Sequence, residues 1–169
     1  MAIIKQKDQR VGIFIDTQNL YHTAKNLYKR KVNFANVVKD TLAGRNLIRA
    51  IAYAITTESE DESAFLSALT KAGIETKVKD LQIFFDGSKK ADWDIGLAID
   101  AVSMAPKLDA IIIVSGDGDF VPLCRYLQYH HGVQVEVATF GKSASASLKE
   151  AANDFFDLSD TPKKYLLGY

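Results

Sequence analysis

The 169-residue sequence has little of several features that mark special classes of protein. It contains one cysteine, Cys124, so an internal disulfide is excluded and a reducing compartment is expected. No run approaches the roughly 20 apolar residues that span a bilayer. The N-terminal segment MAIIKQKDQR turns polar after four residues and lacks the apolar stretch of a signal peptide. We therefore expect a cytoplasmic protein that makes no membrane contact.

The chain has no excess of either charge, because 21 basic residues balance 21 acidic ones. Composition alone therefore gives no indication of nucleic-acid binding. Basic residues do gather locally, in the segment 25–31 and at Lys77, Lys79, Lys89 and Lys90. Such clusters are most often solvated surface. The sequence also lacks internal repeats and linkers, so its length predicts a single domain over residues 1–169.

Apolar segments typical of strands alternate with segments of helical periodicity along the chain. Strands are expected at residues 11–15, 47–55, 78–85, 110–114, 133–137 and 155–158. Helices are expected at 20–28, 35–42, 65–72, 95–105, 120–127 and 144–152, and the 95–105 helix is apolar nearly all round, which predicts full burial. This alternation predicts an α/β fold, a mainly parallel sheet with helices on both faces. In such sheets ligands bind beyond the carboxyl ends of the strands, where the strand order switches.

Two acidic motifs directly follow predicted buried strands. Asp16 follows VGIFI and begins the motif DTQN, whereas Asp117 and Asp119 lie in SGDGDF after AIIIV. If both strands are parallel, these three carboxylates emerge at the same edge of the sheet. Gly116 and Gly118 allow tight or left-handed turns that aim the acids at one point.

Converging carboxylates repel each other, so they either take up protons or hold a cation. Because all the candidate ligands are oxygens, Mg²⁺ or Mn²⁺ is the expected ion. A purely structural alternative stays open, in which Asp16 and Asp119 cap the helices that follow them.

A third acidic feature is the segment DWDIGLAID, which contains Asp94 and Asp100. Asp94 lies at the predicted start of an apolar helix, where an N-cap is again the alternative to a ligand. The two aspartates are six residues apart, or about 120° around a helix, so they should not face the same ion. We expect Asp94 to be the ligand and Asp100 to hold the SGDGD loop by hydrogen bonds.

These motifs resemble the NYN (LabA-like) family, which is related to PIN domains. The resemblance rests on FIDTQNL (14–20), DIGLAIDA (94–101) and SGDGDFVPL (115–123), and it extends through VATFGKSASASL (137–148) and ANDFFDL (152–158). It covers about residues 10–160. One departure is Ala91-Asp92-Trp93, where relatives often carry Lys-Gly-Val.

The resemblance implies a PIN-like three-layer α/β/α sandwich and a metal-dependent ribonuclease. Its acidic cluster maps onto the following catalytic and metal-binding positions: Asp16, Asp94, Asp117 and Asp119. The accompanying polar positions are Asn19, Asp100 and Ser115. The expected substrate is single-stranded RNA, and relatives of this kind often form homodimers.

The expected reaction is phosphodiester hydrolysis assisted by Mg²⁺ or Mn²⁺. Candidates to contact the RNA backbone are Lys25, Lys29, Arg30, Lys89 and Lys90. The main alternative is a non-catalytic RNA- or protein-binding module of the same fold. Another is a phosphatase with Asp16 as nucleophile, although Thr17-Gln18 lacks the second carboxylate that haloacid dehalogenase-like enzymes carry two residues later.

Overall fold

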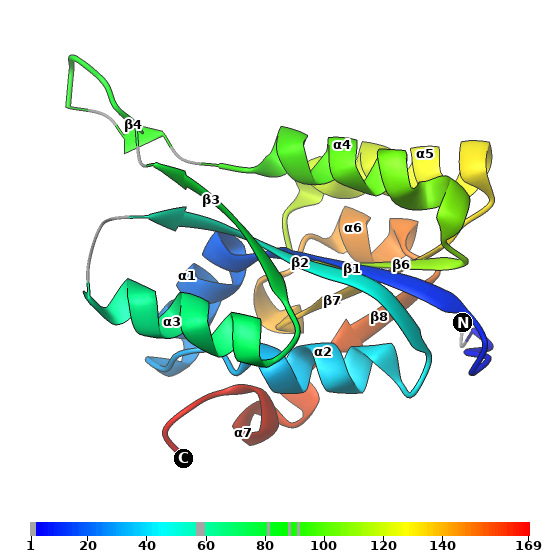
Figure 1. Ribbon diagram of the computed structural model, residues 1–169, viewed down its shortest axis with the longest axis horizontal. Helices are drawn as coiled ribbons and strands as arrows, with labels where there is room; N and C mark the ends of the chain where they lie inside the picture. The colour runs from blue at the N-terminus through cyan, green and yellow to red at the C-terminus, as the bar shows by residue number, and fades with distance from the viewer. Residues whose placement is uncertain (1–2, 57–59, 81, 88, 91) are drawn as a thin grey trace.

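A six-stranded sheet with the order β3-β2-β1-β6-β7-β8 forms the centre of the molecule, and every neighbouring pair is parallel (Figure 1). The computed structural model describes residues 3–56, 60–80, 82–87, 89–90 and 92–169. The strands of the sheet are β1 (Arg10–Asp16), β2 (Asn46–Thr56), β3 (Glu75–Asp80), β6 (Ala110–Val114), β7 (Gln134–Thr139) and β8 (Asp154–Asp157). The α/β fold predicted from the alternating segments is therefore confirmed.

Helices cover both faces of this sheet (Figure 1). One layer contains α1 (Thr17–Tyr28), α2 (Phe34–Leu42), α3 (Glu60–Lys71) and the short α7 (Pro162–Tyr165). The other contains α4 (Asp94–Met104), α5 (Val121–His131) and α6 (Ala146–Ala151). The central strand β1 serves both layers, because Ile13 and Ile15 pack into the first core while Phe14 packs into the second. Alternate residues of a strand point to opposite faces, so a wholly apolar strand is what this position requires.

The third strand is shorter than the alternation of residues 78–85 predicted. β3 ends at Asp80, which pairs with Thr56, the last residue of β2. Residues Gln82–Ile83 form β4 instead, which pairs antiparallel with β5 (Lys89–Lys90). Leu81, which the prediction included in the strand, lies outside the described residues.

The expectation that the 95–105 helix is buried all round was wrong. α4 buries Leu97 and Ala101 against the sheet, but Ile95 is 76% exposed and Ile99 is 59% exposed. The helix therefore covers the sheet with one face and leaves apolar side chains on the other. Within the described ranges, no helix has both the length and the apolar content needed to cross a membrane.

A buried ion pair fastens the segment before β2 to the distant strand β7. The side chains of Arg45 and Glu136 are 0% and 4% exposed, and the guanidinium donates two hydrogen bonds to the carboxylate, at 2.8 and 3.0 Å. Arg45 also donates to the carbonyl oxygens of Leu42 and Thr41. The charge of the guanidinium is thus balanced by the Glu136 carboxylate, and its other N–H groups bind carbonyl oxygens at the end of α2. A buried charge is tolerated when it is paired and hydrogen-bonded in this way.

Candidate metal centre

The two acidic motifs that follow β1 and β6 lie side by side in the middle of the sheet. Ile15 of β1 pairs in parallel with Val114 of β6, so Asp16 and Ser115 are the next residues at the same edge. β1 and β6 are also the strands at which the order switches, with β2 and β3 on one side and β7 and β8 on the other. This is where an open parallel sheet forms its ligand-binding crevice.

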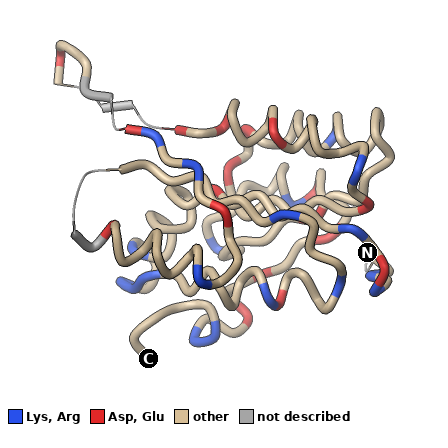
Figure 2. Tube along the Cα trace, in the orientation of Figure 1, with Lys and Arg blue, Asp and Glu red and all other residues tan. Residues whose placement is uncertain are grey.

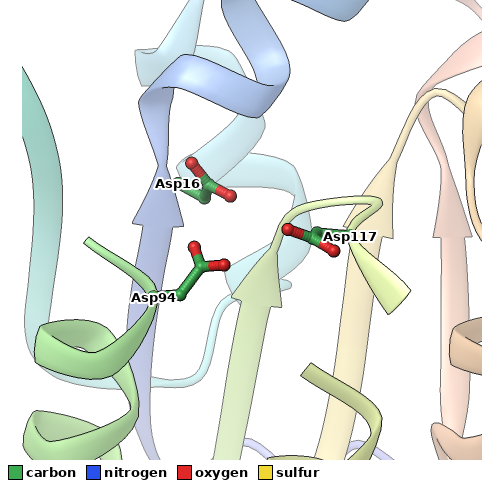
Figure 3. A group of neighbouring side chains, drawn as sticks. All are labelled: Asp16, Asp94 and Asp117. Carbon is green, nitrogen blue, oxygen red and sulfur yellow. The ribbon is translucent and has the colours of Figure 1, made fainter. Parts of the chain in front are cut away.

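Three carboxylates converge at this switch point (Figure 3). Asp16, Asp94 and Asp117 each offer an oxygen, and the three atoms lie within 4.8 Å of one another. Asp16 ends β1, Asp94 is the first residue of α4, and Asp117 lies in the loop after β6. All three side chains are partly buried. The fold therefore gathers acids from three separate segments at one point.

Asn19 and Ser115 connect the loop after β6 to the end of β1. The Ser115 hydroxyl donates to Asp16 Oδ2 at 3.0 Å and accepts the backbone N–H of Asp117 at 3.1 Å. Asn19 Oδ1 accepts the backbone N–H of Gly116 at 2.9 Å, and its own N–H donates to Asp16 Oδ1 at 3.3 Å. Asp16 is thus both the N-cap of α1 and a member of the acidic group, so its capping role does not remove it from that group.

The glycines of the SGDGD loop lie where a side chain would be crowded. Neither Gly116 nor Gly118 has a positive φ, so of the tight or left-handed turns expected here the left-handed form is not used. A Cβ on Gly116 would lie 3.3 Å from the Cα of Ala144, and one on Gly118 would lie 2.8 Å from Ser145 Oγ. Ser145 N–H also donates to the carbonyl oxygen of Gly116 at 3.0 Å. The segment after β7 therefore packs against the acidic loop and is hydrogen-bonded to it.

Trp93 fixes the start of α4, and with it the position of Asp94. Its indole N–H donates to the carbonyl oxygen of Ala54 at 2.9 Å, and its ring centroid lies 5.6 Å from that of Tyr53. Gly96 admits this ring, because a Cβ there would lie 2.6 Å from Trp93 Cε3. The sequence patterns predicted no role for Trp93, although it is the single tryptophan in the sequence and immediately precedes Asp94.

Asp100 does not hold the SGDGD loop, so that expectation was wrong. Its carboxylate accepts hydrogen bonds from the Tyr53 hydroxyl and from Lys77 Nζ, both at 2.7 Å. Burial raises the pKa of this carboxyl, but the bonds from Lys77 and Tyr53 outweigh it and leave the pKa below its ordinary value. Asp100 therefore ties α4 to β2 and β3, about 1.7 helical turns after Asp94.

Asp119 is exposed and lies outside the group of three converging carboxylates. Its backbone N–H donates to Asp117 Oδ1 at 2.9 Å, so Asp117 caps the short helical turn Gly118–Phe120. α5 itself begins after Phe120, which has no side-chain cap bond, so the idea that Asp119 caps this helix was wrong. Its side chain lines the same cleft as Asp94.

The basic residues proposed to contact RNA lie mostly away from the acids. Lys25 is roughly 14 Å from Asp16 along α1, and its ammonium lies 5.8 Å from the centre of the Tyr21 ring. Lys29 ends that helix, and Arg30 donates to the carbonyl oxygen of Gly168. The guanidinium of Arg30 also packs 4.0 Å from the centre of the Tyr169 ring, so it holds the C-terminal segment.

The side chains of Lys89 and Lys90 lie outside the described part of the chain. Basic segments of β3 lie near the beginning of α4 (Figure 2). Lys79 Nζ donates to the carbonyl oxygen of Asp92 at 3.0 Å and lies 5.2 Å from the centre of the Trp93 ring. Lys79 is therefore a basic side chain beside the acidic group that the sequence analysis did not assign to the site.

The match to a known family decides the identity of the fold. The NYN domain model matches residues 10–159, nearly the whole chain. The chain belongs to the NYN domain family. This confirms the resemblance inferred from the motifs around Asp16, Asp94 and Asp117.

Two relatives extend this comparison. This NYN domain is 31% identical, over 91% of its length and 86% of the relative's, to the low amplitude and bright protein LabA of Synechococcus elongatus. It is 30% identical to a protein of unknown function from Vibrio parahaemolyticus with a crystal structure, which superposes with a TM-score of 0.87 over 98% of this chain and 100% of the other. The α/β fold of the NYN domain is therefore also that of a solved relative.

Asp94 and Asp16 of this NYN domain are protonated more readily than isolated aspartates. Burial, followed by the charges of Asp16 and Asp117, raises the pKa of Asp94 to about 7. Burial also raises the pKa of Asp16, against the opposing hydrogen bonds from Asn19 and Ser115. Carboxylates in this state gain from a proton or from a cation placed among them. The electrostatics of the site therefore favour cation binding.

The raised pKa of Asp94 predicts a pH-dependent stability in the metal-free protein. The folded carboxyl binds its proton up to about pH 7, whereas the unfolded one loses it near 3.8, so the folded state holds more protons between these values. The free energy of unfolding should therefore fall as pH rises through this window. Asp94→Asn should make the NYN domain more stable than the wild type at pH 8 in EDTA, by about 1–2 kcal/mol after allowance for solvent screening. Urea unfolding at pH 5 and pH 8 measures this difference.

Asp100→Asn is the matched control on the same helix. The pKa of Asp100 is lowered, so its ionised form stabilises the folded state and its removal should cost stability at pH 8. Adding Mn²⁺ should stabilise the wild type and leave Asp94→Asn less affected. The free energy of unfolding of the wild type could instead rise between pH 5 and pH 8 in EDTA by the same amount as that of Asp94→Asn. That result would contradict the raised pKa and the charge repulsion at Asp94.

Proposed function

We propose that this NYN domain is a ribonuclease that hydrolyses phosphodiester bonds with the help of Mg²⁺ or Mn²⁺ held by Asp16, Asp94 and Asp117. The observation that carries the proposal is the convergence of the three carboxylates, within 4.8 Å, at the switch point of a parallel sheet. Family membership supports it, because the resemblance to PIN-like nucleases implies this reaction for these positions.

The ligand set fits a hard divalent cation. All three groups are carboxylates, and the group has no histidine or thiol that would favour zinc or copper. Mg²⁺ binds in proteins through one or two carboxylates with water completing its shell, so a partly exposed group of three acids is sufficient. The bound ion would supply positive charge to the phosphate and make the attacking water more acidic.

The chain's own residues keep the acids in place. Ser115 joins Asp16 to the backbone of Asp117, and Asn19 holds the Gly116 amide, so the β1 end and the β6 loop keep a fixed separation. Trp93 does the same for Asp94 by anchoring the start of α4 to β2. Fixed ligands are what metal-assisted catalysis requires. Asp119, exposed at the edge of the site, is proposed to act on water or substrate from there.

Basic side chains are proposed to bind the RNA backbone around this site. Lys79 is one described candidate, because it contacts Asp92 and Trp93 immediately before Asp94. Lys25 and Lys29 on and after α1 are proposed to contact more distant phosphates, as are Lys89 and Lys90. Such contacts add affinity without sequence preference and make binding depend on salt.

Two other functions would use the same fold. A binding module would keep the acids for structure alone, as Asp16 does when it caps α1. A phosphatase would use Asp16 as a nucleophile, but both of its oxygens already accept hydrogen bonds, which lowers their nucleophilicity. The hydrolytic ribonuclease accounts for the presence of Asp94 and Asp117 beside Asp16, and we prefer it for that reason.

The first experiment is an assay of the wild-type protein with end-labelled single-stranded RNA in Mn²⁺, in Mg²⁺ and in EDTA. Cleavage with either ion and none in EDTA is expected. Isothermal titration of Mn²⁺ in the same buffer separates the alternatives: metal binding without cleavage of any RNA or DNA would favour the binding module. A trapped phosphoaspartate at Asp16 would instead establish the phosphatase.

A further inference from the structure

A cleft of about 690 Å³ leads away from the acidic group between α4 and α5. Its lining is contributed by one stripe of each helix: Ile95, Ala98 and Val102 from α4, and Pro122, Leu123 and Tyr126 from α5. The α4 residues are three and four positions apart, and Tyr126 lies three positions after Leu123 and four after Pro122, so each helix lines the cleft with one face. The cleft is thus walled by apolar side chains along its length.

The acids lie at one end of this cleft. Asp92 and Asp94 lie at the beginning of α4 and Asp119 lies just before α5, and all three line the same space. Along α4, Ala98 and Val102 are roughly 6 and 12 Å beyond Asp94. The cleft therefore pairs a cation-binding end with an apolar body of the length of about one nucleotide.

Tyr126 gives the cleft a flat and positioned surface. Its side chain is 44% exposed, although it lies among apolar residues. The ring of His130 stacks on it with centroids 4.5 Å apart and planes inclined by 28°, and His131 approaches its edge at 5.6 Å. Two neighbours thus hold the ring in place, so little conformational entropy is lost when a ligand packs against it.

We propose that this cleft binds the base of a nucleotide next to the cleaved phosphate, with Tyr126 as the stacking residue. The proposal rests on the proposed function, because the acidic end must hold the cation that binds that phosphate. A nucleotide matches both halves of the cleft: its phosphate binds with a cation at the acids, and its flat base packs on apolar and aromatic walls. Bases of unpaired RNA are bound in this way by stacking, with little sequence preference.

A protein partner fits the same cleft less well. It would have to bring its own cations to Asp92, Asp94 and Asp119 at the point where its apolar residues also packed. A nucleotide brings the compensating ion with its phosphate. The experiment below also detects the alternative in which a second copy of this chain packs over the exposed Ile95 and Tyr126.

The test combines a protein change with a change in the RNA. Wild type, Tyr126→Ala and Tyr126→Phe are compared on a fluorescent single-stranded RNA and on a series in which one nucleotide at a time lacks its base. Binding is measured by anisotropy and cleavage by gel, both in Mn²⁺. Tyr129→Ala is the matched control, because Tyr129 is 80% exposed on the same helix and does not line the cleft.

Tyr126→Ala is expected to weaken binding about tenfold, within the range for loss of one base stack. Tyr126→Phe and Tyr129→Ala should bind like the wild type. One abasic position beside the cleavage site should weaken wild-type binding similarly and leave Tyr126→Ala unaffected, since the same contact is already lost. That coupling would not arise if Tyr126 only supported the fold.

The outcomes separate the cleft from the ribonuclease activity. Coupled binding losses without any cleavage would support the cleft and overturn the hydrolytic function. Cleavage with additive effects of Tyr126→Ala and the abasic position would overturn the cleft alone. If light scattering shows that Tyr126→Ala turns a dimer into a monomer, and abasic positions have no effect, the cleft is a subunit interface and the proposal is overturned. Absence of RNA binding by the wild type would also overturn the proposal.

Discussion

Asp117→Asn is expected to lower metal-dependent RNA cleavage by at least about 100-fold while leaving the protein folded. Asp117 is one of the three converging carboxylates, and its amide replacement removes an anionic ligand without changing size. Residues that only orient metal ligands already cost 10- to 100-fold when removed, so loss of a ligand should cost no less. The measurement is the single-turnover cleavage rate in Mn²⁺, with circular dichroism to verify folding.

Two other aspartates serve as controls for this variant. Asp8→Asn alters an exposed aspartate before β1, at the opposite edge of the sheet, and should cleave like the wild type. Asp119→Asn alters the exposed neighbour outside the group of three, so a loss smaller than that of Asp117→Asn is expected. Equal cleavage by Asp117→Asn and wild type would show that the activity belongs to another site or to a contaminant.

Arg45→Ala should destabilise the protein by about 3–5 kcal/mol, the usual cost of leaving one charge of a buried pair without its partner. Glu136 would remain almost completely buried, with Lys5 Nζ at 3.4 Å as its remaining cationic partner, and the carbonyl oxygens of Leu42 and Thr41 would lose the guanidinium donor. Equilibrium unfolding in urea at pH 7 measures the loss.

The double variant Arg45→Met with Glu136→Leu tests whether the loss in Arg45→Ala comes from the missing ion pair or from the buried charge that is left behind. Because apolar residues of similar volume often replace a buried pair at little cost, this variant should be markedly more stable than Arg45→Ala. Arg10→Ala breaks the exposed pair with Asp109 and should cost far less stability than Arg45→Ala, because solvent screens exposed pairs. If Arg45→Ala cost as little as Arg10→Ala, the Arg45–Glu136 pair would have no special role in holding β2 to β7.

The parts of the fold that sequence predicted well are those set by local pattern. Val11–Ile15 and Ala110–Val114 are wholly apolar because the central strands of a parallel sheet are covered on both faces, and this made Asp16 and Ser115 recognisable as strand ends. Edge strands carry a weaker pattern. β3 exposes most of its side chains, so the alternation at Ile83 and Phe85 was mistaken for its continuation.

Contacts between segments that lie far apart in the chain could not be predicted from the sequence. Asp100 lies on α4 as expected, but its partners Tyr53 and Lys77 come from β2 and β3, and helical periodicity cannot reveal them. Arg45 and Glu136 were not singled out for the same reason, since 91 residues separate them. Gly116 was attributed to backbone freedom, whereas the structure shows that a side chain there would crowd Ala144, a contact that local sequence cannot reveal.

The wide sequence separation within the acidic group has a consequence for protein synthesis. Asp16 and Ser115 are 99 residues apart and meet only when β6 has added to β1. A growing chain that has exposed β1, β2 and β3 alone therefore carries one acid of the three without the other two. The three acids that we propose to hold a cation therefore come together only after β6 and the loop that follows it have been synthesised.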